Sequence, residues 1–355
     1  MAQVIFWAAF VGMFYVYAGY PLLLAIWRQL APRPIHKRHY SLSQGRGEPT
    51  VSMVVAMGNE SRNALEKMRN CMELDYPAGK LQIIASLDAP TDGTDTLVRS
   101  CQGVEVVYSQ VRIGKAGALN SGVERATGEI LLFADSRQHF ERHALREIVA
   151  NFADESVGAV SGELILLDER GREASDGTGA YWRYEKKIRA MESAIHSVPG
   201  ATGAIYAIRR ELFVALSEGI VLDDVVIPMR IVLGGWRAIF DSAARAYDSA
   251  SESPEREYQR KTRTLAGNYQ LLVELPELLV PWRNPIFVQF VSHKLGRLLV
   301  PYGLAAFFIS NLFLTGVFYR TVLALQVFWY LLAIVGWLFS TQQQTRQAAT
   351  ANPEA

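Results

Sequence analysis

The chain has 355 residues, half of them hydrophobic and 20% charged, with 36 basic side chains against 35 acidic ones. That balance gives no sign of the clustered basic excess of nucleic-acid-binding proteins, so no nucleic-acid partner is expected. The two cysteines, Cys71 and Cys101, are too few for a disulfide framework and form no CxxC pair. This usage fits a reducing compartment and argues against structural zinc.

Residues 4–27 form an apolar stretch without a charged side chain. The stretch is longer than the ~20 residues that a helix needs to cross a bilayer. A cleaved signal peptide is the alternative, but the three preceding residues are not basic and the stretch runs directly into Arg28. We therefore predict a transmembrane helix over residues 1–27.

Two further apolar stretches, residues 298–318 and 321–339, are separated by little more than Tyr319 and Arg320. Together they are far too long for one helix of a soluble core, so a transmembrane hairpin over 298–340 is predicted. Residues 284–297 mix apolar and basic side chains, which suits an interfacial helix or, equally, a simple linker. The polar segment 341–355 is predicted to be a disordered tail.

The basic side chains that flank the predicted spans lie mainly in the segment between the first and the second span. Because basic residues favour the cytoplasmic side, residues 28–283 are predicted to form a cytoplasmic domain of an integral inner-membrane protein, with membrane lipid as a partner. The basic residues concerned are Arg28, Arg33, Lys37 and Arg38 after the first span, and His293, Lys294 and Arg297 before the second.

The cytoplasmic segment alternates β-branched apolar runs with stretches of helix formers. Such alternation predicts an α/β fold with right-handed βαβ units, a Rossmann-like, mostly parallel sheet and flanking helices. The predicted strands are 50–56, 81–87, 104–108, 129–133 and 157–167, and the predicted helices are 59–74, 92–100, 116–126 and 142–152.

Polar residues follow three of these predicted strands directly. Asn59 and Glu60 come after the first, Asp88 after the second and Asp135 after the fourth. A helix N-cap explains each of them alone. Ligands of parallel sheets, however, bind beyond the carboxyl ends of the strands, so the convergence predicts a binding site.

Seven motifs in order resemble those of family-2 glycosyltransferases with a GT-A fold, close to membrane-bound enzymes that make polysaccharides or glycolipids. The resemblance covers about Val51 to Gln270. It implies an inverting transferase that moves a sugar from a nucleotide-diphosphate donor, such as a UDP-sugar, to a polysaccharide or lipid-linked acceptor. The motifs are VSMVVAMGNE (51–60), SLDAPTDGT (86–94), GKAGALNSG (114–122), ADSRQ (134–138), GATGAIYAIRRELF (200–213), LDDVVIPMRI (222–231) and REYQRKTRTLAGNYQ (256–270).

On the donor side, the resemblance places Asn59 and Glu60 beside the nucleotide base and ribose. Asp88 would accept a hydrogen bond from the uracil ring. Lys115, directly before a predicted helix, would neutralise the diphosphate. An ordinary loop leading into a helix is the alternative for that last motif.

ADSRQ stands where the family has an Asp-x-Asp pair that holds a divalent cation. Asp135 matches the first carboxylate and is the candidate ligand for Mg²⁺ or Mn²⁺, whereas Arg137 replaces the second. An arginine cannot ligate a cation but can clamp a diphosphate itself. Alternatively, Arg137 pairs with a nearby carboxylate such as Asp223 and shapes the loop.

The remaining motifs imply the acceptor side and the catalytic base. Asp224 matches the family's general base and Asp223 its neighbour, although the pair could also simply cap a helix. Thr202 and Gly203 belong to the acceptor loop, where small residues let a sugar approach the backbone.

Arg263 matches the family arginine that contacts the diphosphate, with Arg260 in the place of a glutamine. Thr264 replaces the tryptophan that stacks the acceptor sugar, which argues against processive elongation. A basic amphipathic helix at the membrane surface is the alternative for this segment.

Two rival functions stay open at the level of sequence. One is the transfer of a single sugar to polyprenyl phosphate, and the other is a non-catalytic membrane scaffold with the same fold. Three predicted spans are few for a polymer channel, so separate export or polymerisation proteins are possible partners.

Overall fold

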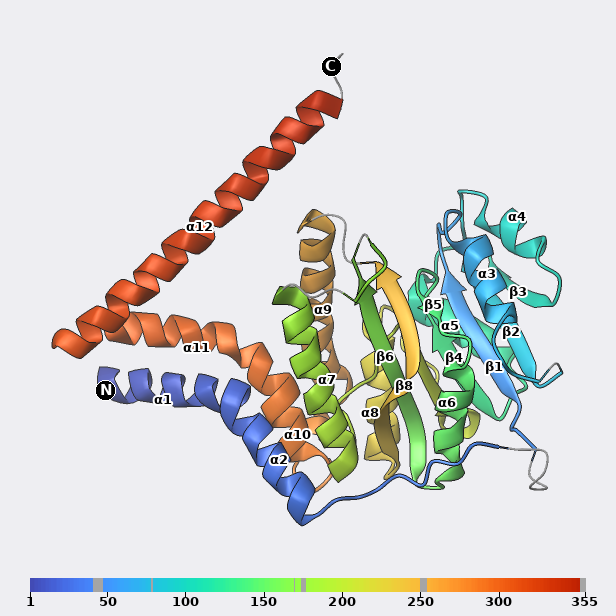
Figure 1. Cartoon of the computed structure of the whole chain (residues 1–355), viewed down its shortest axis with the longest axis horizontal. Coiled ribbons are helices and arrows are strands. Elements are labelled where there is room, and N and C mark those ends of the chain that lie inside the picture. The colour runs from blue at the N-terminus through green and yellow to red at the C-terminus, as the bar shows by residue number, and fades with distance from the viewer. Residues whose placement is uncertain (41–46, 78, 169, 174–176, 250–253, 352–355) are drawn as a thin grey trace. The chain divides into compact units, whose positions relative to one another are not determined.

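The computed structural model describes residues 1–40, 47–77, 79–168, 170–173, 177–249 and 254–351. The chain divides into two compact units, shown in one view in Figure 1. One comprises Met1–Tyr20 with Gly296–Ala355, and the other comprises Pro21–Leu295. Each is described by itself.

The larger unit is built on an eight-stranded sheet with strand order β3-β2-β1-β4-β7-β6-β8-β5. Its first half is parallel throughout and confirms the strands expected there. Neighbouring residues of β1 enter different cores: Met53 and Val55 pack on one side and Val54 on the other. Burial on both faces explains the nearly continuous apolar run. The strands of this half are β1 (Val51–Met57), β2 (Leu81–Asp88), β3 (Val104–Ser109) and β4 (Ile130–Ala134).

The second half of the sheet is mixed. The central β7 runs antiparallel to both β4 and β6, β6 and β8 pair in parallel, and β5 is antiparallel to β8. Four of the seven strand pairings among the described residues are parallel, so the sheet is mostly parallel, as expected. The strands are β5 (His139–Phe140), β6 (Val157–Leu167), β7 (Ile205–Arg209) and β8 (Arg237–Ser249).

Helices cover both faces of the sheet (Figure 1). Residues of α3 and α6 join one core, and residues of α5 and α8 join the other. At Gly122 of α5 a Cβ would lie 2.5 Å from Val54 Cγ1, so only glycine allows this approach of helix and sheet. The helices are α2 (Tyr20–Leu30), α3 (Ala64–Met72), α4 (Thr94–Arg99), α5 (Gly114–Glu124), α6 (Ala144–Ala150), α7 (Gly177–Ile195), α8 (Asp223–Leu233), α9 (Pro254–Glu274) and α10 (Phe287–Gln289).

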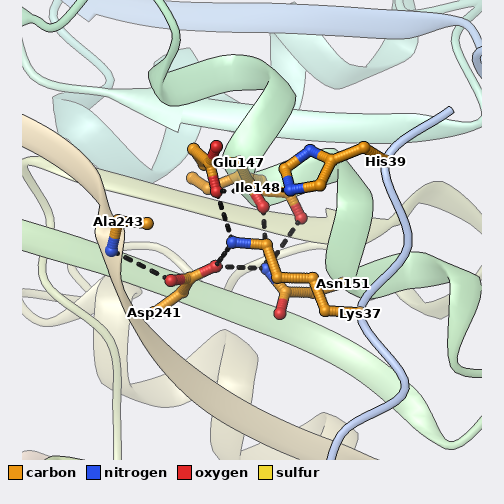
Figure 2. Close-up of polar contacts among 7 residues, drawn as sticks. All are labelled: Lys37, His39, Glu147, Ile148, Asn151, Asp241 and Ala243. Atoms are coloured by element: carbon orange, nitrogen blue, oxygen red, sulfur yellow. Dashed lines mark hydrogen bonds and ion pairs between the residues drawn. The ribbon is translucent and has the colours of Figure 1, made fainter. Parts of the chain in front are cut away.

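Residues 31–40, which follow α2, lie along this domain as a strap. The Arg38 N–H donates to Ala150 O at 3.0 Å, so backbone contacts hold the strap. Lys37 anchors it: its Nζ contacts the Glu147 carboxylate and lies 2.8 Å from Asp241 Oδ2 (Figure 2). Asn151 Nδ2 donates to the same Asp241 oxygen at 2.6 Å. Burial disfavours the ammonium, but the two carboxylates outweigh it and raise the pKa of Lys37.

Lys37→Met is expected to lower the free energy of unfolding by about 1–2 kcal/mol, because it leaves two neighbouring carboxylates without their shared cation. The melting temperature of the detergent-solubilised protein measures the effect. Lys187→Met, at an exposed lysine of α7, is the matched control and should change it little. Equal melting temperatures for the two variants would show that the anchor contributes nothing.

The smaller unit contains α1 (Ala2–Phe14), the π-helical turn η1 (Tyr15–Gly19), α11 (Gly296–Asn311) and α12 (Val317–Ala351). Aromatic packing joins these helices: the Phe6 and Phe307 rings stack at 4.4 Å, and those of Trp7 and Phe318 at 5.9 Å.

Two helices in the described part of the chain are long and apolar enough to cross a membrane, Ala2–Leu30 and Val317–Leu338. The expectation of three spans is corrected at 298–318, where α11 has only 16 residues and ends at Asn311. A helix of that length reaches about 24 Å, less than the ~30 Å of a hydrocarbon core.

The C-terminal tail also differs from expectation, whereas residues 284–297, for which a helix was one of two expectations, are helical over most of their length. Residues 287–295 are helical, as α10 and the π-helix η6 (Phe290–Leu295). Residues 341–351, expected to be disordered, continue α12, and residues 352–355 of that predicted tail lie outside the described residues.

Candidate active site

A cavity of about 770 Å³ opens at the carboxyl ends of β1, β2 and β4. This is where a parallel sheet places its ligands. Most of the donor-side residues singled out in the sequence line it, namely Glu60, Asp88, Lys115, Asp135, Arg137, Arg260 and Arg263. The structure thus brings together side chains that lie up to two hundred residues apart in the sequence.

Lys115 is the central cation of this cavity. Its Nζ lies 2.8 Å from Asp135 Oδ1 and 3.0 Å from Asp223 Oδ1, so one ammonium bridges two carboxylates from different motifs. Burial disfavours the ammonium, but Asp223, Asp135 and Asp224 together outweigh it and raise the pKa of Lys115. Lys115 therefore stays charged at physiological pH and fixes the two aspartates.

Asp223 and Asp224 open α8, where the positive end of the helix dipole favours carboxylates. The buried Asp223 accepts a hydrogen bond from Tyr206 Oη at 3.0 Å. Asp224 Oδ2 accepts one from the Gly203 N–H at 2.8 Å. Burial, and then the charge of Asp223, raises the pKa of Asp224 to about 6, while Lys115 and Lys294 oppose the shift.

The acceptor-loop residues lie beside these carboxylates. A Cβ at Gly203 would lie 3.3 Å from Asp224 Oδ2 and 3.4 Å from Asp135 Oδ2, so the two carboxylates flank this glycine. The Thr202 N–H donates to Ser161 Oγ at 3.0 Å. A Cβ at this position would therefore contact both carboxylates closely.

Arg137 pairs with a carboxylate that the sequence analysis did not consider. Its Nη2 lies 3.0 Å from Asp248 Oδ2 on β8, not beside Asp223. Gln138 Nε2 donates to the same oxygen at 2.7 Å. The buried Lys67 donates to Gln138 O at 2.8 Å and so holds this loop from behind. About half of the Arg137 side chain is exposed (54%) at the cavity.

Asn59 and Asp88 also organise loops around the cavity. Asn59 Oδ1 accepts from the Thr91 N–H at 2.8 Å and does not line the cavity, so its role beside the nucleotide stays a prediction. Asp88 lines the cavity and accepts from the Ile113 N–H at 2.7 Å, which leaves its second oxygen for other partners.

Arg260 and Arg263 reach the cavity from α9. Arg260 pairs with Glu257 on the same helix. For Arg263, no carboxylate lies within 4.0 Å among the residues that the structure describes, so its charge is available to a ligand of the cavity.

The described side chains do not by themselves make a site for a divalent cation. Among them, no group of three or more His, Cys, Asp or Glu residues is placed to hold a metal ion. Asp135 Oδ1 already binds Lys115, and Arg137 stands where a second carboxylate would serve. Asp135 is the residue that would contribute to a metal site completed by a ligand.

The sequence analysis missed several residues that shape the site, chiefly Asp248, Lys67 and Tyr206. Asp248 lies near the end of β8, whose second half is polar and partly exposed, and β8 is not among the predicted strands. Lys67 and Tyr206 lie inside regular elements, and no local pattern distinguishes them.

The model of the family described as glycosyl transferase family 2 matches residues 52–216. Among curated proteins, the beta-monoglucosyldiacylglycerol synthase of Trichormus variabilis is 23% identical over 256 residues, covering 68% of this chain and 54% of that protein. The poly-beta-1,6-N-acetyl-D-glucosamine synthase of Staphylococcus aureus strain COL is 21% identical over 230 residues, covering 63% and 55%. The chain thus spans about half the length of these relatives.

Among solved structures, a mannosyltransferase from Pyrobaculum calidifontis, in complex with GDP-Man and Mn²⁺, matches with a TM-score of 0.74 at 22% identity. The match covers 99% of this chain and 98% of that one. Residues 1–349 of S. aureus TarS, in complex with UDP-GlcNAc, match with a TM-score of 0.51 at 14% identity, covering 74% and 80%. These likenesses confirm the expected α/β GT-A fold.

Proposed function

Because the model of glycosyl transferase family 2 matches residues 52–216, we propose that this chain is an inverting glycosyltransferase that uses a nucleotide-diphosphate sugar as donor. One observation carries this proposal. Lys115 bridges Asp135 and Asp223 at a cavity rich in cations, and Asp224 lies directly beside them. Charged groups gathered in this way at a cavity, with shifted pKa values, are typical of a functional site.

The donor diphosphate fits the cationic part of the cavity. Lys115, Arg137 and Arg263 provide positive charge there, and two of them are already held in place by carboxylates. Departure of the nucleoside diphosphate places negative charge on its phosphate oxygens. Cations that are held in position before the reaction stabilise such charge without reorganisation.

Asp224 is the proposed general base. As a carboxylate it takes the proton from the acceptor hydroxyl while that oxygen attacks the anomeric carbon of the donor sugar. The bond to the diphosphate breaks on the opposite side, so the anomeric configuration inverts and no enzyme nucleophile is needed. A base with a pKa near 6 is ionised at neutral pH and still basic enough to accept a proton.

The proposed acceptor is a lipid-linked molecule or a polysaccharide. Support comes from the relatives, whose names describe a glucosyldiacylglycerol synthase and a poly-N-acetylglucosamine synthase. Transfer of one sugar to polyprenyl phosphate is the alternative, and the size of the product separates the two.

A panel of nucleotide sugars tests the proposal. Purified protein in detergent with a membrane lipid extract should release UDP or GDP from one donor of the panel, and the release should depend on the extract. A panel that covers the common UDP- and GDP-sugars and gives no turnover would contradict the proposed function.

The pH dependence of kcat/KM should show an acid limb with an apparent pKa near 6. Asp224 accepts a proton only when ionised, so the rate should fall tenfold per pH unit below that value. The charged groups facing it are Asp223, Asp135, Lys115, Lys294 and Arg189, so the value belongs to the coupled cluster. A rate that is flat from pH 7 down to pH 5 would exclude Asp224 as the base.

We also propose that the domain is cytoplasmic and the protein lies in the inner membrane. The basic residues on either side of the domain and the two candidate spans support this.

An impermeant thiol reagent tests the topology in intact cells. Glu155→Cys, at an exposed site in a Cys101→Ser background, should stay unlabelled until the cells are permeabilised. Ala2→Cys in the same background should be labelled from outside. The reverse pattern would invert the proposed topology.

A further inference from the structure

A second polar cluster, outside the residues that line the donor cavity, joins one face of α7 to η6. Glu185, Arg189 and Glu192 recur at spacings of four and three residues, which places them on the same face of α7. The buried His293 of η6 bridges the two glutamates: its Nδ1 lies 2.8 Å from Glu192 Oε1 and its Nε2 lies 2.8 Å from Glu185 Oε1. We call these four residues the α7–η6 cluster.

Opposite charges attract one another within the α7–η6 cluster. Burial disfavours the imidazolium, but the two glutamates outweigh it and raise the pKa of His293. Arg189 lies between the same glutamates along α7 and is attracted by both. π-helical turns are frequent at functional sites, and His293 lies in the π-helical segment η6.

Arg189 extends from this cluster to the acceptor loop. Its Nη2 donates to Ser161 Oγ at 2.8 Å and to Gly200 O at 3.2 Å. Ser161 Oγ in turn accepts from the Thr202 N–H at 3.0 Å. The guanidinium also lies over the Phe240 ring, 5.0 Å from its centroid. One side chain therefore fixes the loop at both Gly200 and Thr202.

The same loop holds Asp224. The Gly203 N–H donates to Asp224 Oδ2 at 2.8 Å, and the Ala201 N–H donates to Asp224 O at 2.7 Å. The position of the Asp224 carboxylate thus depends on the loop, and the position of the loop depends on Arg189. Arg189 is also attracted by the Asp224 charge itself.

We propose that Arg189 is a positioning residue that holds residues 200–203 so that the Gly203 N–H orients Asp224 for the proton transfer. The inference rests on the proposed role of Asp224 as general base. Arg189 acts on the rate and not on donor binding, because the donor cavity is lined by other residues. Glu185 and Glu192 attract the guanidinium, and His293 binds both glutamates.

Arg189→Met tests this inference, with Arg183→Met at an exposed arginine of the same helix as the control. We expect Arg189→Met to lower kcat about 10- to 100-fold, since a small misplacement of a reacting group has effects of this size. Affinity for UDP or GDP, whichever the donor panel identifies, should stay within twofold. The acid limb of kcat/KM should move to higher pH, because Asp224 loses a nearby cation and its fixed hydrogen bond.

Ser161→Ala keeps the arginine and removes only the hydroxyl between it and Thr202, so it serves if Arg189→Met does not fold. It should lower kcat about 2- to 10-fold, as expected for one hydrogen bond, with nucleotide affinity unchanged. If kcat and the acid limb match wild type in every folded variant, or if nucleotide affinity falls as much as kcat, the inference is wrong. The role of Asp224 is judged separately from Asp224→Asn: full activity of that variant overturns the proposed function, whatever the arginine variants show.

Discussion

Asp224→Asn is expected to lower turnover ~10²–10⁴-fold, the usual effect of losing a general base, while the nucleotide binds as before. Asparagine has nearly the same shape and can still accept the Gly203 N–H hydrogen bond, so the loop should stay in place. Only the ability to take a proton is lost. Turnover of the donor that the panel identifies, and calorimetric titration with its nucleoside diphosphate, measure the two quantities.

Glu124→Gln is the matched control for this variant, because it removes one carboxylate at an exposed position of α5. It should leave both turnover and nucleotide affinity unchanged. If Asp224→Asn keeps the turnover of wild type, Asp224 is not the base. If it loses nucleotide affinity in proportion to turnover, Asp224 acts in binding.

Arg137→Ala is expected to cost ~2–4 kcal/mol of transition-state stabilisation, the range for loss of one fixed donor at a developing negative charge. The structure supports an effect of this size, because Asp248 pairs with the Arg137 guanidinium at the cavity. Gln138 donates to the same Asp248 carboxylate and fixes its position. If the arginine supplies charge that a metal supplies elsewhere in the family, activity should persist, though reduced, when divalent cations are chelated. Turnover with chelator and with added Mg²⁺ or Mn²⁺ measures this directly.

Two variants sharpen the Arg137 experiment. Asp248→Asn keeps the arginine but removes its ion pair, so it should lower kcat less than Arg137→Ala does. Arg137→Asp rebuilds the usual carboxylate pair and should make activity strictly metal-dependent or abolish it. Complete loss of wild-type activity on chelation, restored by metal, would instead show that Asp135 holds an essential cation. A loss of melting temperature without a loss of rate in Arg137→Ala would assign the arginine a structural role.

The parallel half of the sheet could be predicted because its strands follow one another closely in the sequence and are buried on both faces. The run at 50–56 and the one at 81–87 appear in the structure as β1 and β2, within one residue at each end. The acidic residues after these strands could be placed at one rim for the same reason. Asp88 and Asp135 do line one cavity.

The mixed half of the sheet could not be predicted in the same way. β7 and β8 pair with strands that lie far away in sequence, and the local pattern around Asp248 contains nothing that identifies its partner. For the same reason, the alternative that pairs Arg137 with a carboxylate names Asp223, whereas the carboxylate that Arg137 contacts in the structure is Asp248. Long-range pairing decides such contacts, and a single sequence does not encode it in a local pattern.

The membrane segments depend on polar contacts as well as on composition. Apolar composition alone suggested a span over 298–318, but the helix α11 ends at Asn311, whose side chain donates to Tyr319 O at 3.2 Å. Hydropathy does not reveal this polar contact, which lies where the chain turns. The first predicted span agrees in length and position with the helix Ala2–Leu30.

The anomeric configuration of the product tests the account most directly. NMR of the glycoside formed by purified protein from its donor gives the configuration of the new bond. Direct attack by an acceptor hydroxyl deprotonated by Asp224 predicts inversion relative to the donor, with one nucleoside diphosphate released for each sugar transferred. A product that retains the donor configuration would contradict the account. Retention requires either an enzyme nucleophile or attack on the same face of the sugar from which the diphosphate leaves. The proposed role of Asp224 would then be wrong as well.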